Sequence, residues 1–213
     1  MNAGNRMNAD ESKAKLVQDL NFSDEKIAKL EIFVNEVLNY NKKYNLISKS
    51  SENDIWLRHV LDSAQLIKFI DPQKNHSLAD LGTGAGFPGI VLSIFYSDVL
   101  AFHVKLYEKS PVKNNFLKKI VHKIRLKVDI YDNDYQYHIL NSDYIVCRAF
   151  KKLPEILRIS RETVQKSHKL IVMMGKSAQE EINKASKDMI YKYKLVPSIT
   201  NKDSKILLVD VVR

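Results

Sequence analysis

The sequence is poor in the residues that build covalent or metal-bound scaffolds. Its 213 residues include a single cysteine, Cys147, so no internal disulfide and no cysteine-rich zinc site can form. No H-E-x-x-H pair occurs, no apolar run approaches the roughly 18 residues of a membrane helix, and the polar stretch 1–5 is unlike a signal peptide. We therefore expect a cytoplasmic protein that uses neither a metal nor a membrane.

Acidic residues are too few to balance the basic ones, and the imbalance is local. Lys and Arg outnumber Asp and Glu by 34 to 25, which gives a net charge of +9. Residues 1–76 contain 11 side chains of each sign, whereas residues 77–213 contain 23 basic and 14 acidic side chains. Much of the surplus falls into two groups: Lys118, Lys119, Lys123, Arg125 and Lys127, then Arg148, Lys151, Lys152, Arg158, Arg161, Lys166 and Lys169. These groups favour a polyanionic substrate held through its phosphates, although solvated helix faces would give the same pattern.

Glycine is also scarce, which makes its distribution informative. Only six glycines occur, and four of them lie between Gly82 and Gly89, directly after the apolar run 78–81. A glycine-rich turn between a strand and a helix lets the backbone approach a ligand and directs free N–H groups at an anion. Pro88 stands where the first turn of that helix begins, a position that tolerates its missing N–H. The segment therefore predicts a site for a ligand with an anionic group.

Two nucleoside cofactors fit the glycine spacing. The last three of these glycines satisfy the G-x-G-x-x-G pattern of dinucleotide sites. Asp80 and the first three glycines satisfy the pattern acidic-x-G-x-G-x-G, which is similar to the first motif of S-adenosylmethionine-dependent methyltransferases. A buried carboxylate is costly without a partner, and the ammonium of S-adenosylmethionine provides one that a dinucleotide lacks. Asp80 therefore favours S-adenosylmethionine, while Glu108, after the next apolar run, is placed to bind a ribose diol of either cofactor.

Apolar β-branched runs alternate with charged helical segments from about residue 77 onward. We expect strands at 78–81, 101–107, 127–131, 143–147, 169–174, 190–196 and 205–212. We expect helices at 10–19, 24–42, 53–69, 88–97, 111–123, 152–166 and 177–188. This alternation predicts an α/β open sheet, mainly parallel, whose last two strands form an antiparallel hairpin. Ligands then bind at the carboxyl ends of the strands.

Ionisable side chains gather at two further points. Arg58 and Asp62 are four residues apart on an expected helix, and His59 is three residues from Asp62, so all three are neighbours there. A surface ion pair beside a buried histidine is the simplest explanation of this group. Arg148 follows the buried run 144–146 and stands near the expected cofactor loop. We expect it to hold an anion.

Four motifs, in their order and spacing, resemble a single family. They are Asn45–Ser48, Arg58–Ser63, Asp80–Gly89 and Arg148–Phe150. From about residue 20 onward the chain is similar to the bacterial ribosomal RNA small-subunit methyltransferase G family, also called glucose-inhibited division protein B. The resemblance implies a Rossmann-like class I S-adenosylmethionine-dependent methyltransferase domain at 77–213, preceded by a helical cap at 1–76.

The resemblance also implies an activity and its residues. The expected reaction is methyl transfer from S-adenosylmethionine to N7 of one guanosine in the 530 loop of 16S ribosomal RNA, as naked RNA or in the 30S subunit, by a monomer. Together with the glycine-loop argument, it gives as cofactor-binding residues Gly82, Gly84, Gly86, Phe87, Glu108, Tyr135, Gln136 and Arg148. The residues expected to contact RNA are Arg58, His59, Lys151, Lys152 and Lys176. Tyr135 and Gln136 stand where the family has a small residue and a glutamate, so we expect contacts through their backbone.

The chemistry of this reaction explains why no general base stands out. Guanine N7 carries a free lone pair, so its attack on the sulfonium methyl needs no prior deprotonation. The protein must align donor and acceptor and tolerate the positive charge that passes to the base. We expect Asp62 to be the catalytic carboxylate that does so. The alternatives are a methyltransferase for another RNA, a dinucleotide-dependent oxidoreductase and a non-catalytic RNA-binding module. Cofactor binding would distinguish the last two from a methyltransferase.

Overall fold

A seven-stranded sheet forms the centre of the computed structural model, which describes residues 7–73, 77–132, 139–185 and 192–213. The strands are β1 (Ser77–Leu81), β2 (His103–Tyr107), β3 (Val128–Tyr131), β4 (Tyr144–Arg148), β5 (His168–Met174), β6 (Tyr193–Pro197) and β7 (Lys205–Val211). Their order is β3-β2-β1-β4-β5-β7-β6. Strands β1 to β5 pair in parallel, whereas β7 is antiparallel to both β5 and β6. The predicted mainly parallel α/β sheet with a final antiparallel hairpin is confirmed.

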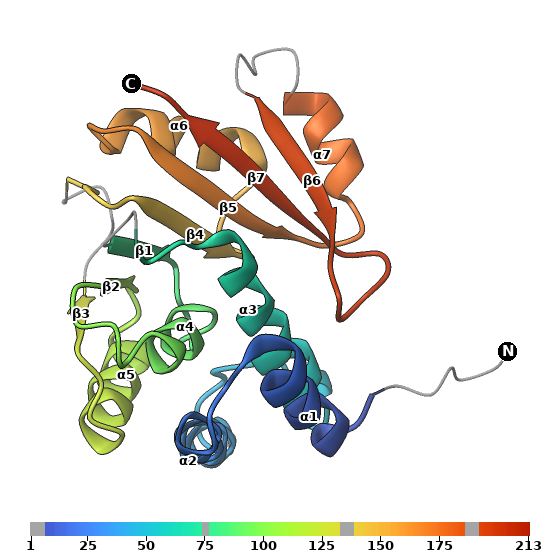
Figure 1. Ribbon diagram of the computed structural model, residues 1–213, viewed down its shortest axis with the longest axis vertical. Coiled ribbons are helices and arrows are strands. Elements are labelled where there is room, and N and C mark those ends of the chain that lie inside the picture. Colours follow the sequence, from blue (N-terminus) through green and yellow to red (C-terminus); the bar gives the residue numbers. More distant parts are fainter. Residues whose placement is uncertain (1–6, 74–76, 133–138, 186–191) are drawn as a thin grey trace, which may run out of the picture.

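Helices cover both faces of the sheet (Figure 1). α6 (Leu153–Thr163) and α7 (Ala178–Ala185) lie on one face, and α4 (Gly89–Phe95) and α5 (Pro111–Lys123) lie on the other. The N-terminal helices α1 (Ala9–Leu20) and α2 (Asp24–Asn41) extend this second layer, where α2 packs against α4 and α5. None of the described helices is long and apolar enough to cross a membrane.

The helix expected at 53–69 is not a regular α-helix. Its first part, η2 (Trp56–Leu61), is π-helical, its middle, α3 (Asp62–Ala64), is a single α-helical turn, and its end, η3 (Gln65–Phe69), is a 3-10 helix. A short 3-10 turn, η1 (Lys49–Ser51), precedes it. π-Helical turns are rare and occur frequently at functional sites. Their hydrogen bonds run from residue i to i+5 rather than to i+4, so the regular α-helix expected over 53–69 is wrong.

The strands bury their side chains in two apolar clusters, one on each face of the sheet. In β1, Leu78 belongs to the cluster under α4 and α5, whereas Ala79 and Leu81 belong to the cluster under α6 and α7. The first cluster also contains Leu16 and Phe33 from the N-terminal helices. Those helices therefore share a core with the sheet, and this shared core fixes them relative to the strand ends.

Candidate active site

The glycine loop connects β1 with α4. Gly82, Gly84 and Gly86 have φ angles of 69°, 61° and 102°, in the left-handed region that glycine enters without a steric penalty. A Cβ atom on Gly82 would also lie 2.4 Å from Cδ2 of Phe150, so the Phe150 ring packs directly on this glycine. The loop thus has the conformation that a close backbone approach requires, and Phe150 borders it on one side.

Asp80 lies under this loop and is fully buried. Its Oδ2 accepts the N–H of Gly89 at 2.7 Å, where α4 begins. Its Oδ1 has no hydrogen-bond partner among the described residues. Burial raises the pKa of Asp80 to about 7, even though the neighbouring Thr83 hydroxyl and the Gly89 N–H oppose this shift. A buried acceptor of this kind fits a ligand that brings a donor, such as the ammonium group of S-adenosylmethionine.

Glu108 connects the loop with the end of β2. The side chain is 8% exposed, and each of its two oxygens accepts a backbone N–H group. Oε2 accepts from Gly84 at 3.0 Å, and Oε1 accepts from Ser110 at 2.8 Å. The carboxylate is therefore held beside the glycine loop at the carboxyl edge of the sheet, the place that the sequence predicts for it.

Phe87 brings the loop into contact with the N-terminal helices. Its ring is buried and lies 4.9 Å from that of Phe33 in α2. On another side it lies 4.9 Å from the imidazole of His59 in η2. The loop, α2 and η2 therefore meet around one aromatic side chain. Tyr135 and Gln136, the other predicted cofactor contacts, lie outside the described residues.

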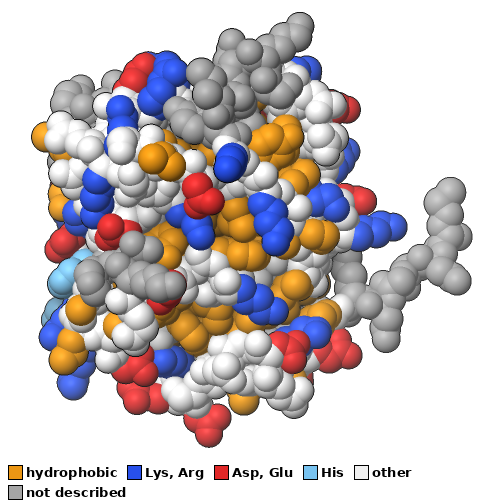
Figure 2. All heavy atoms as spheres, turned by 45° about the horizontal axis from the view of Figure 1, so that its top comes forward, with side chains coloured by type: hydrophobic (Ala, Val, Ile, Leu, Met, Phe, Trp, Pro, Cys, Tyr) orange, Lys and Arg blue, Asp and Glu red, His pale blue; other side chains and the backbone are white. Residues whose placement is uncertain are grey.

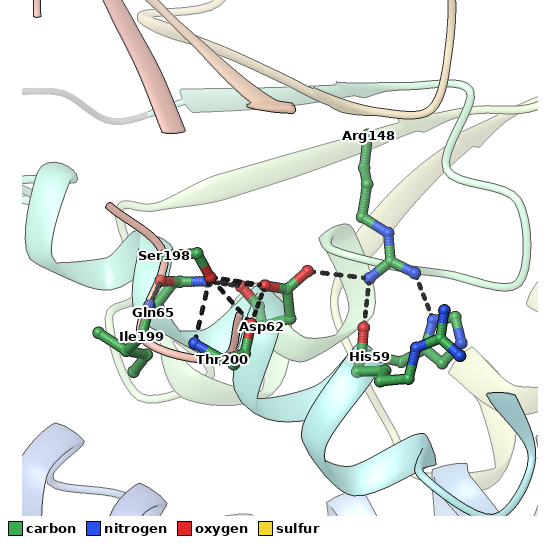
Figure 3. Close-up of polar contacts among 8 residues, drawn as sticks. His59, Asp62, Gln65, Arg148, Ser198, Ile199 and Thr200 are labelled. Carbon is green, nitrogen blue, oxygen red and sulfur yellow. Dashed lines mark hydrogen bonds and ion pairs between the residues drawn. The ribbon is translucent and has the colours of Figure 1, made fainter. Parts of the chain in front are cut away.

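Arg148, at the end of β4, reaches across to η2 and α3 (Figure 3). Its Nη1 donates to the backbone carbonyl of Arg58 at 3.1 Å and lies 3.5 Å from Oδ2 of Asp62. Its Nη2 donates to Nδ1 of His59. The anion that Arg148 holds within the protein is thus the Asp62 carboxylate. The surface ion pair between Arg58 and Asp62 is wrong, because the exposed Arg58 turns instead to the carbonyl of Ser50.

This contact also fixes the protonation of His59. A guanidinium can only donate, so Nδ1 of His59 must accept and its proton must be on Nε2. Burial lowers the pKa of His59 to about 3, and the positive charges of Arg148 and Arg58 act in the same direction. The imidazole is therefore neutral at physiological pH. Its Nε2–H is buried and has no acceptor among the described residues.

Asp62 is the most heavily bonded side chain of the site (Figure 3). Its Oδ1 accepts from Thr200 Oγ1 at 2.6 Å, from Gln65 Nε2 at 2.8 Å and from Ser198 Oγ at 3.2 Å. Burial raises the pKa of Asp62, while these hydrogen bonds and the charge of Arg148 lower it. Both carboxylate oxygens are therefore engaged with groups of the protein.

Three of the residues expected to contact RNA lie at one edge of the sheet, while Arg58 and His59 lie on η2. Lys151 and Lys152 follow β4, and Lys176 follows β5, so all three lie at the carboxyl ends of neighbouring parallel strands. All three are exposed, and Lys151 forms an ion pair with Glu155 at 3.0 Å. On the face in Figure 2, basic side chains are dispersed among acidic and apolar ones rather than gathered in one area.

Part of the basic surplus has partners within the protein. Lys119 and Lys123 of α5 both pair with Glu36 of α2, and Lys166 pairs with Asp143 at 2.7 Å. Contacts between α5 and α2 tie the N-terminal helices to the sheet layer. The first basic group is therefore partly a helix-packing feature, which its composition alone did not reveal.

Several residues at the site were not predicted. Phe150 borders the glycine loop, and Gln65, Ser198 and Thr200 surround Asp62. Gln65 lies three residues after Asp62, which is a signal that helical spacing could have provided. No pattern in the sequence indicates that residues near 200 reach a helix near 62.

The described residues contain no group of three or more His, Cys, Asp or Glu side chains that could hold a metal ion. Cys147 lies in β4 and is fully buried, and burial raises the pKa of its thiol. Since the thiolate is the reactive form, this cysteine has the properties of a core residue rather than of a nucleophile.

Comparison with known sequences gives one consistent result. The family model described as rRNA small subunit methyltransferase G matches residues 26–208. A protein of Pelagibacter ubique named ribosomal RNA small subunit methyltransferase G is 32% identical over 202 residues, covering 93% of this chain and 94% of its own. A protein of the same name from Rickettsia bellii is 38% identical over 183 residues, covering 86% and 92%.

Solved structures with similar folds include methyltransferases. A SAM-dependent O-methyltransferase from Thermotoga maritima matches with a TM-score of 0.58 at 15% identity, over 85% of this chain and 71% of its own. A SAM-dependent methyltransferase from Aquifex aeolicus matches with a TM-score of 0.56 at 14% identity, over 78% and 96%. At this identity the matches establish the fold and not the substrate.

Proposed function

The chain belongs to the rRNA small subunit methyltransferase G family. From this membership and from the geometry of the site, we propose which residues bind the cofactor, position the reactants and contact the RNA. Its activity is methyl transfer from S-adenosylmethionine to 16S ribosomal RNA, at N7 of a guanosine in the 530 loop. The N7–CH₃ bond forms as the S–CH₃ bond breaks, the bonding electrons stay on sulfur, and the positive charge passes to the base. No proton is removed, so the protein needs no general base.

We propose that the loop of Gly82, Gly84, Gly86 and Phe87 binds the cofactor. When bound, S-adenosylmethionine provides an activated methyl group and an ammonium group. The observation that carries this assignment is the buried Oδ1 of Asp80, which has no partner among the described residues and can accept from the ammonium. Glu108 would accept from the ribose hydroxyls, since its carboxylate already lies beside the loop. Tyr135 and Gln136 remain predicted cofactor contacts.

The contacts of Asp62 favour an indirect role, in which it does not itself contact the target base. Its carboxylate is saturated by three donors and by the guanidinium of Arg148. We propose that it acts by holding Arg148 at the end of β4, where Arg148 contributes to the cofactor site. His59, whose neutral Nε2–H lacks an acceptor among the described residues, is the side chain we propose to meet the substrate from the cap.

Substrate RNA would bind at the carboxyl edge of the sheet. Arg58, Lys151, Lys152 and Lys176 are exposed there or on the adjoining helix and can contact phosphates. We propose a monomeric, cytoplasmic enzyme whose cap (1–76) and sheet domain (77–213) work as one unit, because they share a core. Naked 16S rRNA and the 30S subunit are both possible substrates.

A labelling experiment tests this proposal. The protein is incubated with methyl-labelled S-adenosylmethionine and 30S particles from cells that lack this modification, and the labelled base is mapped. Label at N7 of one guanosine in the 530 loop is expected, with 50S particles as the negative control. Label elsewhere would contradict the assigned base, and binding of NADH in place of S-adenosylhomocysteine would contradict the assigned cofactor.

A further inference from the structure

The turn between β6 and β7 is bonded to the helical stretch of the cap. Figure 1 shows this turn next to the helix labelled α3. The backbone N–H of Ile199 donates to Oε1 of Gln65 at 2.9 Å, and Nε2 of Gln65 lies 3.0 Å from Oγ of Ser198. Gln65 thus anchors the turn through both ends of its amide, and the Ser198 hydroxyl in turn lies 2.9 Å from that of Thr200.

Thr200 makes a different contact. Its hydroxyl donates to Oδ1 of Asp62 at 2.6 Å, the shortest hydrogen bond that this carboxylate receives from the three donors. Ser198 adds a weaker contact at 3.2 Å. Because Thr200 and Ser198 of the turn bond Oδ1, the other oxygen, Oδ2, faces Nη1 of Arg148 at 3.5 Å. Figure 3 shows this chain of contacts from the turn to Arg148.

The arrangement has a consequence for the guanidinium. Arg148 is a long side chain with many rotamers, and only its contacts keep it across the gap between β4 and η2. Two of these contacts, with the Arg58 carbonyl and His59, come from neutral groups, and the third comes from the charged Asp62. Any group that keeps Asp62 ionised and correctly rotated therefore also keeps Arg148 in place.

We propose that Thr200 is a positioning residue for methyl transfer: its hydroxyl holds the Asp62 carboxylate against Arg148 and so fixes the guanidinium at the end of β4. This inference rests on the proposed role of Arg148 in the active site. It makes the β6–β7 turn, more than 130 residues from Asp62 in sequence, a part of the catalytic machinery.

The test compares two variants, Thr200→Val and Thr200→Ser. Valine keeps the shape of the side chain and removes the donor, whereas serine keeps the donor. Thr163→Val is the matched control, because the Thr163 hydroxyl makes a comparable bond of 2.7 Å to a backbone carbonyl in α6. We measure kcat, KM for 30S particles and the pH profile of kcat at saturating S-adenosylmethionine, which excludes effects of cofactor binding.

We expect Thr200→Val to lower kcat about tenfold with little change in KM, and Thr200→Ser to restore most of the loss. The position of the acidic limb in the pH profile of kcat should also change, which a purely structural role of Thr200 would not cause. Without the Thr200 hydroxyl, burial raises the pKa of Asp62 further, so the acidic limb moves to higher pH. The charged groups around Asp62 are Arg148 and, beyond it, Arg58 and Asp80. They stay the same in all variants, and His59 stays neutral, so a shift of the acidic limb between variants reports on Asp62.

Several results would overturn the inference. Among these are an unchanged kcat in Thr200→Val, equal losses in the valine and serine variants, or an unshifted acidic limb. Ser198→Ala is a second variant in case Thr200→Val does not fold, and it should shift the limb in the same direction by less. If the wild-type protein does not methylate 30S particles at all, the proposed function fails, and this outcome is distinct from a failure of Thr200.

Discussion

Replacing Asp80 by Asn should separate the stability of the protein from its affinity for the cofactor. The Asp80 carboxyl is fully buried, and its pKa of about 7 lies well above its ordinary 3.8. Because the folded-state pKa is the higher one, the contribution of Asp80 to stability is most favourable below about pH 4 and is lost as the pH rises through 7. At pH 8 the ionised Asp80 therefore destabilises the ligand-free protein.

The magnitude follows from the same pKa. The difference between 3.8 and about 7 corresponds to about 4 kcal/mol. Asparagine removes this penalty but buries an amide N–H₂ without an acceptor, which costs roughly 1–3 kcal/mol. The ligand-free Asp80→Asn variant should thus be roughly 1–3 kcal/mol more stable than the wild type at pH 8, and no more stable near pH 4.

Cofactor affinity should change in the opposite direction. A charge-assisted hydrogen bond from the ligand ammonium to Oδ1 contributes about 1.5–3 kcal/mol, so S-adenosylhomocysteine should bind about 10- to 150-fold more weakly to the variant. Isothermal titration calorimetry at pH 8 measures this, with 5′-methylthioadenosine as the control ligand because it lacks the amino-acid end. For the wild type alone, affinity for S-adenosylhomocysteine should also fall as the pH drops below about 7.

Two results would refute this reasoning. If both ligands lose affinity equally, Asp80 supports the loop rather than the ammonium. If urea unfolding at pH 8 shows that the variant is less stable than the wild type, the ionised Asp80 does not destabilise the folded protein as its pKa indicates. A general folding defect would lower both stability and affinity, so a variant that is more stable but binds S-adenosylhomocysteine more weakly would point to Asp80 itself.

Three further changes test other parts of the site. Gly89→Ala should destabilise the protein by about 1–3 kcal/mol in urea unfolding, because its Cβ would lie 2.3 Å from a buried leucine side chain; Gly175→Ala, with nothing within 4 Å, should be nearly neutral. The double change of Lys152 and Lys176 to Ala should weaken binding of 30S particles and reduce the slope of log affinity against log salt by about 1 to 2 in filter binding, and unchanged slopes would remove these lysines from the RNA surface. Glu108→Gln should weaken the binding of S-adenosylhomocysteine about tenfold in calorimetry, because the contact with the ribose is reduced. Binding of methionine, which has no ribose, should not change. Equal affinity of the variant and the wild type for S-adenosylhomocysteine would exclude the ribose role.

The strands and the glycine loop could be predicted from the sequence because their signals are local. A buried parallel strand needs a run of apolar residues, and a left-handed turn needs glycine, so both are visible in consecutive positions. The antiparallel pairing of β6 with β7 followed from the missing helix between the last two strands, whereas the place of β7 beside β5 was not predicted. The predicted features depend on neighbours in sequence, and one sequence was sufficient for them.

The connections of the site could not be predicted, because they depend on distant segments. Arg58 and Asp62 have the spacing of an ion pair on an α-helix, but η2 is π-helical, and Asp62 pairs with Arg148 instead. The spacing rule shows which side chains can meet along one helix, but it cannot show that Arg148, 86 residues further on, takes the carboxylate instead. The bond from Thr200 to Asp62 is a long-range contact with no periodicity at all.

The proposed active site includes the cap rather than adding it to a complete site. His59 and Asp62 come from the cap, Arg148 and Phe87 from the sheet domain, and each side chain in this group contacts another across the boundary. The sheet alone would leave the Arg148 guanidinium without its carboxylate and the Phe87 ring without His59. In this proposal the sheet completes its site only with the cap docked, and the core that the cap shares with the strands keeps it in that position.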